Sequence, residues 1–238
     1  GIKHKSRLIT VLGAVLILFS VILPAFLSFW GNMLWYENLE YGNRFWRVFL
    51  TKVYCIVIAA IVSYFYVMLL TLGVPAKKRL FRRYARYVGL IIGGIWGIRQ
   101  WDNVLLFINR TMFDMTDPIL NMKTGFYLFM LPLFNNIYFL FAVLTVVAVL
   151  IHLVSLFLKL ENSELVMDKT DEASEKSLVP LAVNVGILLI ILALGKYLNR
   201  FYLLYSSRGV VEGPGWTDVH VKLPSYSIVI VLTVLSEI

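Results

Sequence analysis

The sequence predicts an all-α protein, a polytopic bundle of transmembrane helices, because the chain is very apolar and its charges are clustered. Of its 238 residues, 60% are hydrophobic and 15% are charged, with a mean hydropathy of +0.80. Soluble domains carry roughly 25% charged residues. Six windows contain no charge: Leu8–Tyr36, Val53–Ala76, Tyr87–Ile98, Thr124–Leu158, Ser177–Gly195 and Leu223–Ser236. A soluble core cannot enclose this much apolar chain, so a soluble enzyme, a disordered tail and a disulfide scaffold are excluded.

The first two windows predict complete membrane-crossing helices over about 8–29 and 51–72. A crossing helix needs about 20 apolar residues. The first helix is longer than the roughly 7–15 residue apolar region of a signal peptide, so we interpret it as a retained helix. Gly73 and Pro75 end the second helix.

The third helix, about 84–101, is distinguished by glycine. Gly89, Gly93 and Gly97 are spaced by four residues and share one helix face. Such a face lets another helix backbone approach closely within a bilayer. The partner could equally lie in this chain or in another copy, so the face also predicts a homo-oligomer or membrane-protein contact.

Three further helices follow, over about 131–158, 178–198 and 225–238. Pro132 stands near the start of the first of these, where a missing N–H is tolerated. The charged linker between 159 and 176 predicts a loop or a short surface helix. The last run spans only about 21 Å, so we expect five full helices and a truncated sixth, in a chain that is a fragment of a longer protein.

Charge indicates orientation in a plasma membrane. The chain has 22 basic and 14 acidic residues, a net charge of +8, and its densest basic run is Lys77–Arg86. Short basic loops lie on the cytoplasmic side, which places the N-terminus inside. The expected partner is the lipid bilayer. Nucleic acid is not expected, because this run contains no acidic residue and lies directly between two apolar windows, which favours a cytoplasmic loop.

The outer loops contain the distinctive polar residues. Asp114 and Asp117 precede Pro118, and we favour a turn with an Asp cap over a pair of ligands. In the last loop, Val219–Leu223 alternates as an extended segment. The candidate outer-loop motif residues are Arg208, Gly209, Trp216, Asp218, His220 and Pro224.

Within that motif, Asp218 and His220 could contribute to a metal site. Two ligands alone do not make one, so hydrogen bonding, with Arg208 paired to Glu212 or Asp218, is the favoured interpretation. We expect no metal and no cofactor.

Three sequence runs resemble the uncharacterised protein family (UPF) numbered 0182: WYENLEY, TDPILNMKTGFYLFMLP and LLYSSRGVVEGPGWTDVHVKLP. The resemblance implies a bacterial or archaeal multi-pass membrane protein, with about seven helices followed by a large extracytoplasmic region. This chain differs where Glu40 replaces a common glycine and where Lys123-Thr124 replaces an acidic-hydrophobic pair. The family carries no established activity.

The function is therefore inferred from the residues of this sequence. The sequence contains no HExxH, GxSxG or GxxxxGK[ST] motif, so we expect no catalysis and no catalytic residues. The helix centres offer only a few polar residues, among them Ser63 and Asn184, and we expect Asn184 to bond a neighbouring helix. A membrane scaffold or anchor presenting outer loops is favoured, and handling of a lipid or envelope component is the alternative. A lipid-sized apolar groove would favour the alternative, and a closely packed bundle the scaffold.

Overall fold

The computed structural model is all-helical apart from one short hairpin, which confirms the predicted class. It describes residues 2–74, 79–111, 113–161, 164–167, 175–205 and 213–235. The α-helices are α1 (Ile2–Asn38), α2 (Gly42–Leu70), α3 (Arg79–Ile108), α4 (Leu131–Phe157), α5 (Glu175–Tyr202) and α6 (Leu223–Leu235). Two π-helical turns, η2 (Phe126–Met130) and η4 (Asp218–Lys222), precede α4 and α6, and the 3-10 turn η3 (Leu203–Tyr205) follows α5.

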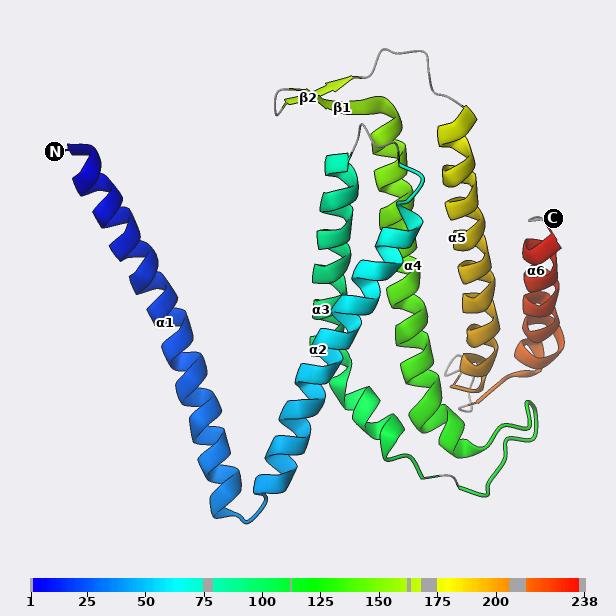
Figure 1. Ribbon diagram of the computed structural model, residues 1–238. Helices are drawn as coiled ribbons and strands as arrows, with labels where there is room; N and C mark the ends of the chain where they lie inside the picture. The colour runs from blue at the N-terminus through cyan, green and yellow to red at the C-terminus, as the bar shows by residue number, and fades with distance from the viewer. Residues whose placement is uncertain are drawn as a thin grey trace. The chain divides into compact units, whose positions relative to one another are not determined.

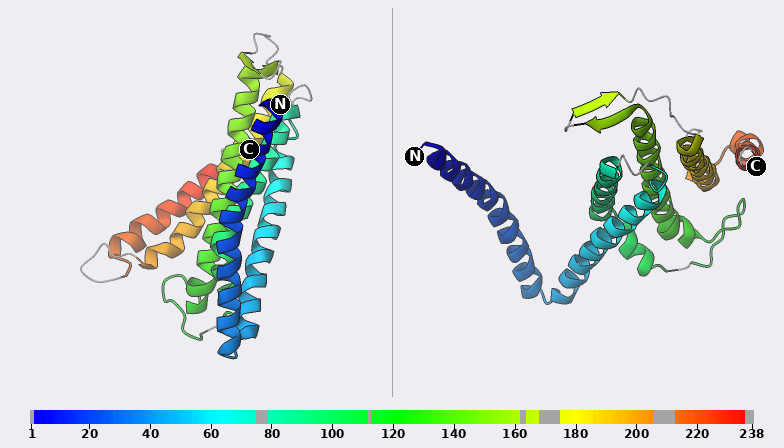
Figure 2. Two further views of the ribbon diagram at one scale, coloured as in Figure 1. Left: turned by 90° about the vertical axis from the view of Figure 1, so that its left-hand side faces the viewer. Right: turned by 45° about the horizontal axis from the view of Figure 1, so that its top comes forward.

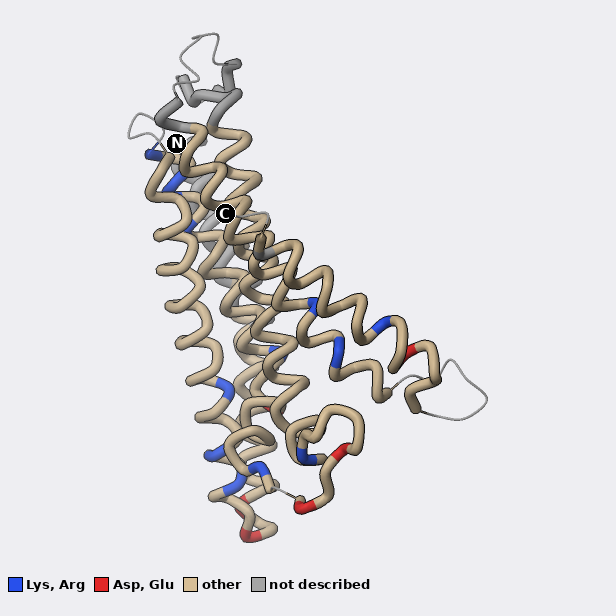
Figure 3. Tube along the Cα trace, turned by 90° about the vertical axis from the view of Figure 1, so that its right-hand side faces the viewer, with Lys and Arg blue, Asp and Glu red and all other residues tan. Residues whose placement is uncertain are grey.

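Among the described residues, three helical stretches are long and apolar enough to cross a membrane. They are Gly42–Leu70, Phe126–Ser155 and Leu178–Tyr205. They contain most of the second, fourth and fifth predicted helices. In Figure 3, charged residues gather towards helix ends, with long uncharged stretches between them.

The chain divides into two compact units, and the first comprises Gly1–Thr51. Within it, α1 and the start of α2 form a helical hairpin in which the ring of Phe29 lies 5.4 Å from that of Phe45 and 5.1 Å from that of Phe49. Glu40, in the turn, has a φ of 63°. This left-handed conformation favours glycine, which gives a physical reason for the common glycine that the resemblance implies here.

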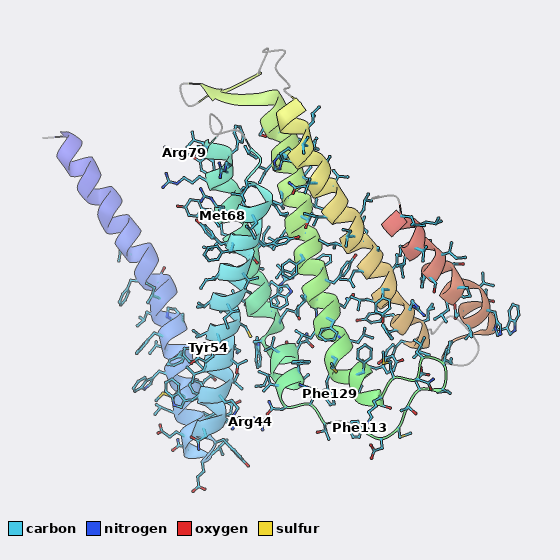
Figure 4. All side chains as sticks on the ribbon, turned by 45° about the vertical axis from the view of Figure 1, so that its right-hand side comes forward. Arg44, Tyr54, Met68, Arg79, Phe113 and Phe129 are labelled. Carbon is cyan, nitrogen blue, oxygen red and sulfur yellow. The ribbon has the colours of Figure 1, made fainter. Side chains whose placement is uncertain are left out.

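The second unit, Lys52–Ile238, contains the layer of helices α3, α4, α5 and α6, each packed against the next (Figures 1 and 2). Met68 and Arg79 lie towards one end of this layer, and Phe113 and Phe129 towards the other (Figure 4). We refer to these as the Arg79 end and the Phe113 end.

Both π-helical turns have the same cause, a Leu-Pro step at the start of the following helix. Leu131 donates its N–H to the carbonyl of Phe126, and Leu223 donates to the carbonyl of Asp218, five residues back in each case. The next residue, Pro132 or Pro224, has no N–H, and its ring clashes with the carbonyl four residues earlier. A wider turn relieves this clash. Pro132 therefore lies within a continuous helix that begins at Thr124, upstream of the predicted start.

The linker after α4 differs from the prediction. Strands β1 (Leu158–Glu161) and β2 (Glu164–Met167) form an antiparallel hairpin, with Glu161 paired to Glu164. The prediction of a loop or short surface helix was wrong for these residues. The sequence of β1, LKLE, alternates apolar and charged residues, a pattern typical of a strand.

Candidate functional site

The three glycines of α3 lie against α2 of the same chain. A Cβ built on Gly97 would lie 2.5 Å from the carbonyl oxygen of Cys55 and 2.6 Å from Cα of Ile56. One built on Gly89 would lie 3.0 Å from the carbonyl oxygen of Ser63. Since these neighbours are mostly backbone atoms, only glycine fits there. The glycine face is thus an intramolecular contact in this structure.

A buried polar junction joins α2, α4 and α5. Asn184 Nδ2 donates to the carbonyl of Leu70 at 3.0 Å and lies 3.0 Å from Nδ1 of His152. Leu70 ends α2, where helix carbonyls have no partner in their own helix. The prediction that Asn184 bonds a neighbouring helix is confirmed. Which of the two side chains donates in the contact between Asn184 and Nδ1 of His152 depends on the tautomer of the histidine ring.

His152 is 1% exposed, and its Nε2 has no hydrogen-bond partner among the residues that the structure describes. Sequence reasoning did not predict the contact of this side chain with Asn184. The two residues are 32 positions apart, and no sequence signal connects them.

At the Phe113 end, Asp117 organises the loop before η2. Its carboxylate accepts the backbone N–H groups of Ile119 at 3.2 Å and Leu120 at 2.6 Å, and the hydroxyl of Tyr127 at 3.2 Å. This confirms the predicted Asp-capped turn. The ring of Tyr127 in turn contacts that of Phe201 on α5. We call the loop 113–125, η2 and the Phe201 end of α5 the outer platform.

Replacing Asp117 with alanine should loosen the outer platform, because two backbone donors and one hydroxyl lose their acceptor. We expect a loss of about 1–3 kcal/mol and faster proteolytic cleavage within 113–125. Asp114→Ala is the matched control, since the Asp114 side chain is fully exposed and its ion pair with Lys123 is 3.6 Å long. Equal cleavage rates in the two variants would contradict this role of Asp117.

The outer-loop motif is helical where it is described, and the predicted extended segment over 219–223 is wrong. Asp218 reaches back to accept the N–H of Gly215 and forms an ion pair with Lys222, which are helix-capping and (i, i+4) contacts. His220 stacks on Trp216, with ring centroids 4.6 Å apart. These contacts require helical spacing and therefore override the alternating sequence pattern.

The remaining motif residues are only partly described. Pro224 is the second residue of α6, whereas Arg208 and Gly209, together with the predicted partner Glu212, lie outside the described residues. Among the residues that the structure does describe, no three His, Cys, Asp or Glu side chains are grouped to hold a metal ion.

The largest feature that sequence reasoning missed is an apolar groove of about 700 Å³ between α4 and α5. Tyr66 of α2 also borders it, and the Tyr66 hydroxyl is paired with Thr145 Oγ1 at 2.8 Å. The lining residues are Tyr66, Phe134, Ile137, Tyr138, Phe141, Ile187, Ile190, Ile191, Leu194, Tyr197 and Leu198. Because α4 is apolar on every side, its sequence carries no signal for which face borders a groove.

Over the residues that the structure describes, the fold and these sites define an α-helical protein with three helices apolar enough to cross a membrane, with glycine-packed helices and an apolar groove. The chain belongs to the uncharacterised protein family UPF0182, whose family model matches residues 8–238. No solved structure matches the chain.

Three bacterial UPF0182 proteins illustrate the similarity. One from Pelobacter propionicus is 35% identical over 69% of this chain and 17% of its own length. One from Clostridium botulinum (strain Langeland) is 26% identical over 99% of this chain and 29% of its length. One from Corynebacterium jeikeium is 25% identical over 98% of this chain and 26% of its length. The chain thus spans less than a third of the length of these relatives.

Proposed function

We propose that this chain is the membrane domain of a UPF0182 protein and acts as an anchor in the plasma membrane. Five helices, over about 8–29, 51–72, 84–101, 131–158 and 178–198, cross the bilayer, and a sixth begins near 225. The N-terminus is cytoplasmic, so the Phe113 end faces outward and presents the outer platform and the last loop. The length of the relatives supports an anchor for a larger protein.

The observation that carries this proposal is the order of the outer platform. Asp117 fixes the loop on η2, and Tyr127 and Phe201 fix η2 on α5. A loop held by both polar and aromatic contacts on top of apolar helices is suited to present a surface. We propose no catalysis by this chain, and the sequence supports this because it contains no HExxH, GxSxG or GxxxxGK[ST] motif.

Reporter fusions test the topology. Alkaline phosphatase, which is active only outside the cytoplasm, should be inactive when fused after Arg79 and active when fused after Thr217. A cytoplasmic reporter such as green fluorescent protein should give the opposite pattern. Equal activity at both positions would contradict this topology, because the two positions belong to opposite ends of the helical layer.

A second candidate function is the handling of a lipid or other apolar envelope component. The groove between α4 and α5 favours it, since an apolar groove of lipid size is the feature that separates this function from a purely structural anchor. The close packing of α2 on α3 supports the anchor. The two candidate functions are therefore supported by different helix pairs, the anchor by α2 and α3 and lipid handling by α4 and α5.

A further inference from the structure

Arg200 lies in the last turn of α5, beside the groove. Its guanidinium carbon is 5.7 Å from the ring centroid of Tyr197, and Tyr197 lines the groove. The Nε of Arg200 is buried and has no hydrogen-bond partner among the described residues, nor does any salt bridge found among them involve Arg200. The Arg200 side chain as a whole is partly exposed, so Nε–H is the donor that is removed from water. A buried donor without an acceptor is unfavourable, and the positive charge of the guanidinium favours an anionic acceptor beside it.

The groove itself suits a hydrocarbon chain. Along α5 its lining runs from Ile187 to Leu198, which is roughly 16 Å at the helical rise. One leaflet of a ~30 Å hydrocarbon core is about 15 Å deep. The hydroxyl of Tyr66, which could otherwise call for a polar ligand, is already bonded to Thr145.

A helix fits the groove less well. With its side chains a helix is about 10–12 Å across, so a 16 Å length occupies roughly 1300–1800 Å³. The empty space of the groove, counted to the surfaces of its lining atoms, is about 1270 Å³ and includes space open to the outside. A helix would need all of this space, whereas a single acyl chain is thinner and needs only part of it.

We infer that the α4–α5 groove binds one acyl chain of an anionic phospholipid, with the lipid phosphate held by Arg200. This inference rests on the proposed membrane location and deepens the second candidate function by naming the ligand class. Arginine suits the phosphate because its planar guanidinium offers several N–H donors to the phosphate oxygens. Arg200 lies at the C-terminal end of α5, and the apolar lining extends from there along the helix towards Ile187. This is the order of a lipid headgroup and its acyl chain.

The test compares lipids with identical acyl chains on the purified full chain in detergent, by native mass spectrometry. Phosphatidylglycerol should remain bound at lower added concentration than phosphatidylcholine, and inorganic phosphate alone should not bind. Arg200→Gln should weaken phosphatidylglycerol binding about tenfold and leave phosphatidylcholine unchanged. Lys196→Gln is the matched control, because it removes the same charge one turn away, where Lys196 is exposed and outside the groove lining.

The chain-binding part is tested by filling the groove. Ile191→Trp should abolish phosphatidylglycerol binding, whereas Leu192→Trp, on the same helix but outside the lining, should not. If Ile191→Trp fails to fold, phosphatidylglycerol with a photoactivatable acyl chain replaces it, and adducts should map to the lining residues of α4 and α5 in the unaltered protein.

Four results would overturn the inference: equal binding by Arg200→Gln and Lys196→Gln, equal retention of the two lipids, phosphate binding without lipid, or photo-adducts outside the groove. A groove cross-linked to a second copy would also contradict it. Failure of the reporter fusions would instead overturn the membrane topology. Correct fusions without lipid selectivity would leave the anchor standing and remove only this inference.

Discussion

Replacing Gly97 with alanine should markedly lower the thermal stability of the purified protein. The new Cβ would lie 2.5–2.7 Å from three backbone atoms of Cys55 and Ile56, and backbone cannot rotate away as a side chain can. Overpacking of this kind costs about 1–3 kcal/mol. A loss of about 2 kcal/mol corresponds to a Tm roughly 4–8 °C lower, measured by tryptophan fluorescence during heating in detergent.

Gly94 provides the matched control, because a Cβ built there meets nothing within 4 Å. Gly94→Ala should leave the Tm unchanged or raise it slightly, since alanine is the better helix former. Gly93→Leu, on the face against Ala59 and Ser63, should separate α2 from α3, which a cysteine cross-link between the two helices would report. Equal melting of Gly97→Ala and Gly94→Ala would show that the close approach of α2 and α3 contributes nothing to stability.

Replacing Asn184 with alanine should have the second large effect. The substitution removes the donor to the carbonyl of Leu70 and the Asn184 partner of Nδ1 of His152, at a site where Asn184 is 2% exposed. An unsatisfied buried group costs about 1–3 kcal/mol, so we expect a loss of about 2 kcal/mol by thermal unfolding. Asn199→Ala, at an exposed position on the same helix, should change the Tm little.

A double-mutant cycle separates the two bonds of Asn184. If its contact with His152 contributes, the loss from Asn184→Ala together with His152→Leu should be smaller than the sum of the single losses, with a coupling of about 0.5–3 kcal/mol. Strict additivity would assign the stabilising effect to the carbonyl of Leu70 alone.

The sequence predicted the features that depend on one residue type at one spacing. Charge-free windows predicted the helices, and the Asp-Pro step at Asp117 predicted its capped turn. The four-residue spacing of Gly89, Gly93 and Gly97 selected one face of α3, but whether that face met α2 or another copy depended on three-dimensional arrangement.

Features that depend on two distant segments were not predictable. The contact of His152 with Asn184 joins α4 to α5, and the groove depends on how far those helices separate. The error over 219–223 has a different cause. Alternation in VHVKL matches a strand, but the (i, i+4) pairs Trp216–His220 and Asp218–Lys222 were equally visible, and they indicate a helix.

The number of residues in the π-helical turn Phe126–Met130 sets the direction in which the loop before α4 points. In a regular helix one residue corresponds to about 100° of rotation and 1.5 Å of rise. Deleting one residue from this turn would rotate everything upstream of it by about that angle, including the loop that carries Asp117. A deletion between Tyr127 and Leu131 would turn Tyr127 together with that loop, away from the ring of Phe201 on α5. In UPF0182 proteins, a single-residue gap before this Leu-Pro step would therefore change where the outer platform points while leaving every helix intact.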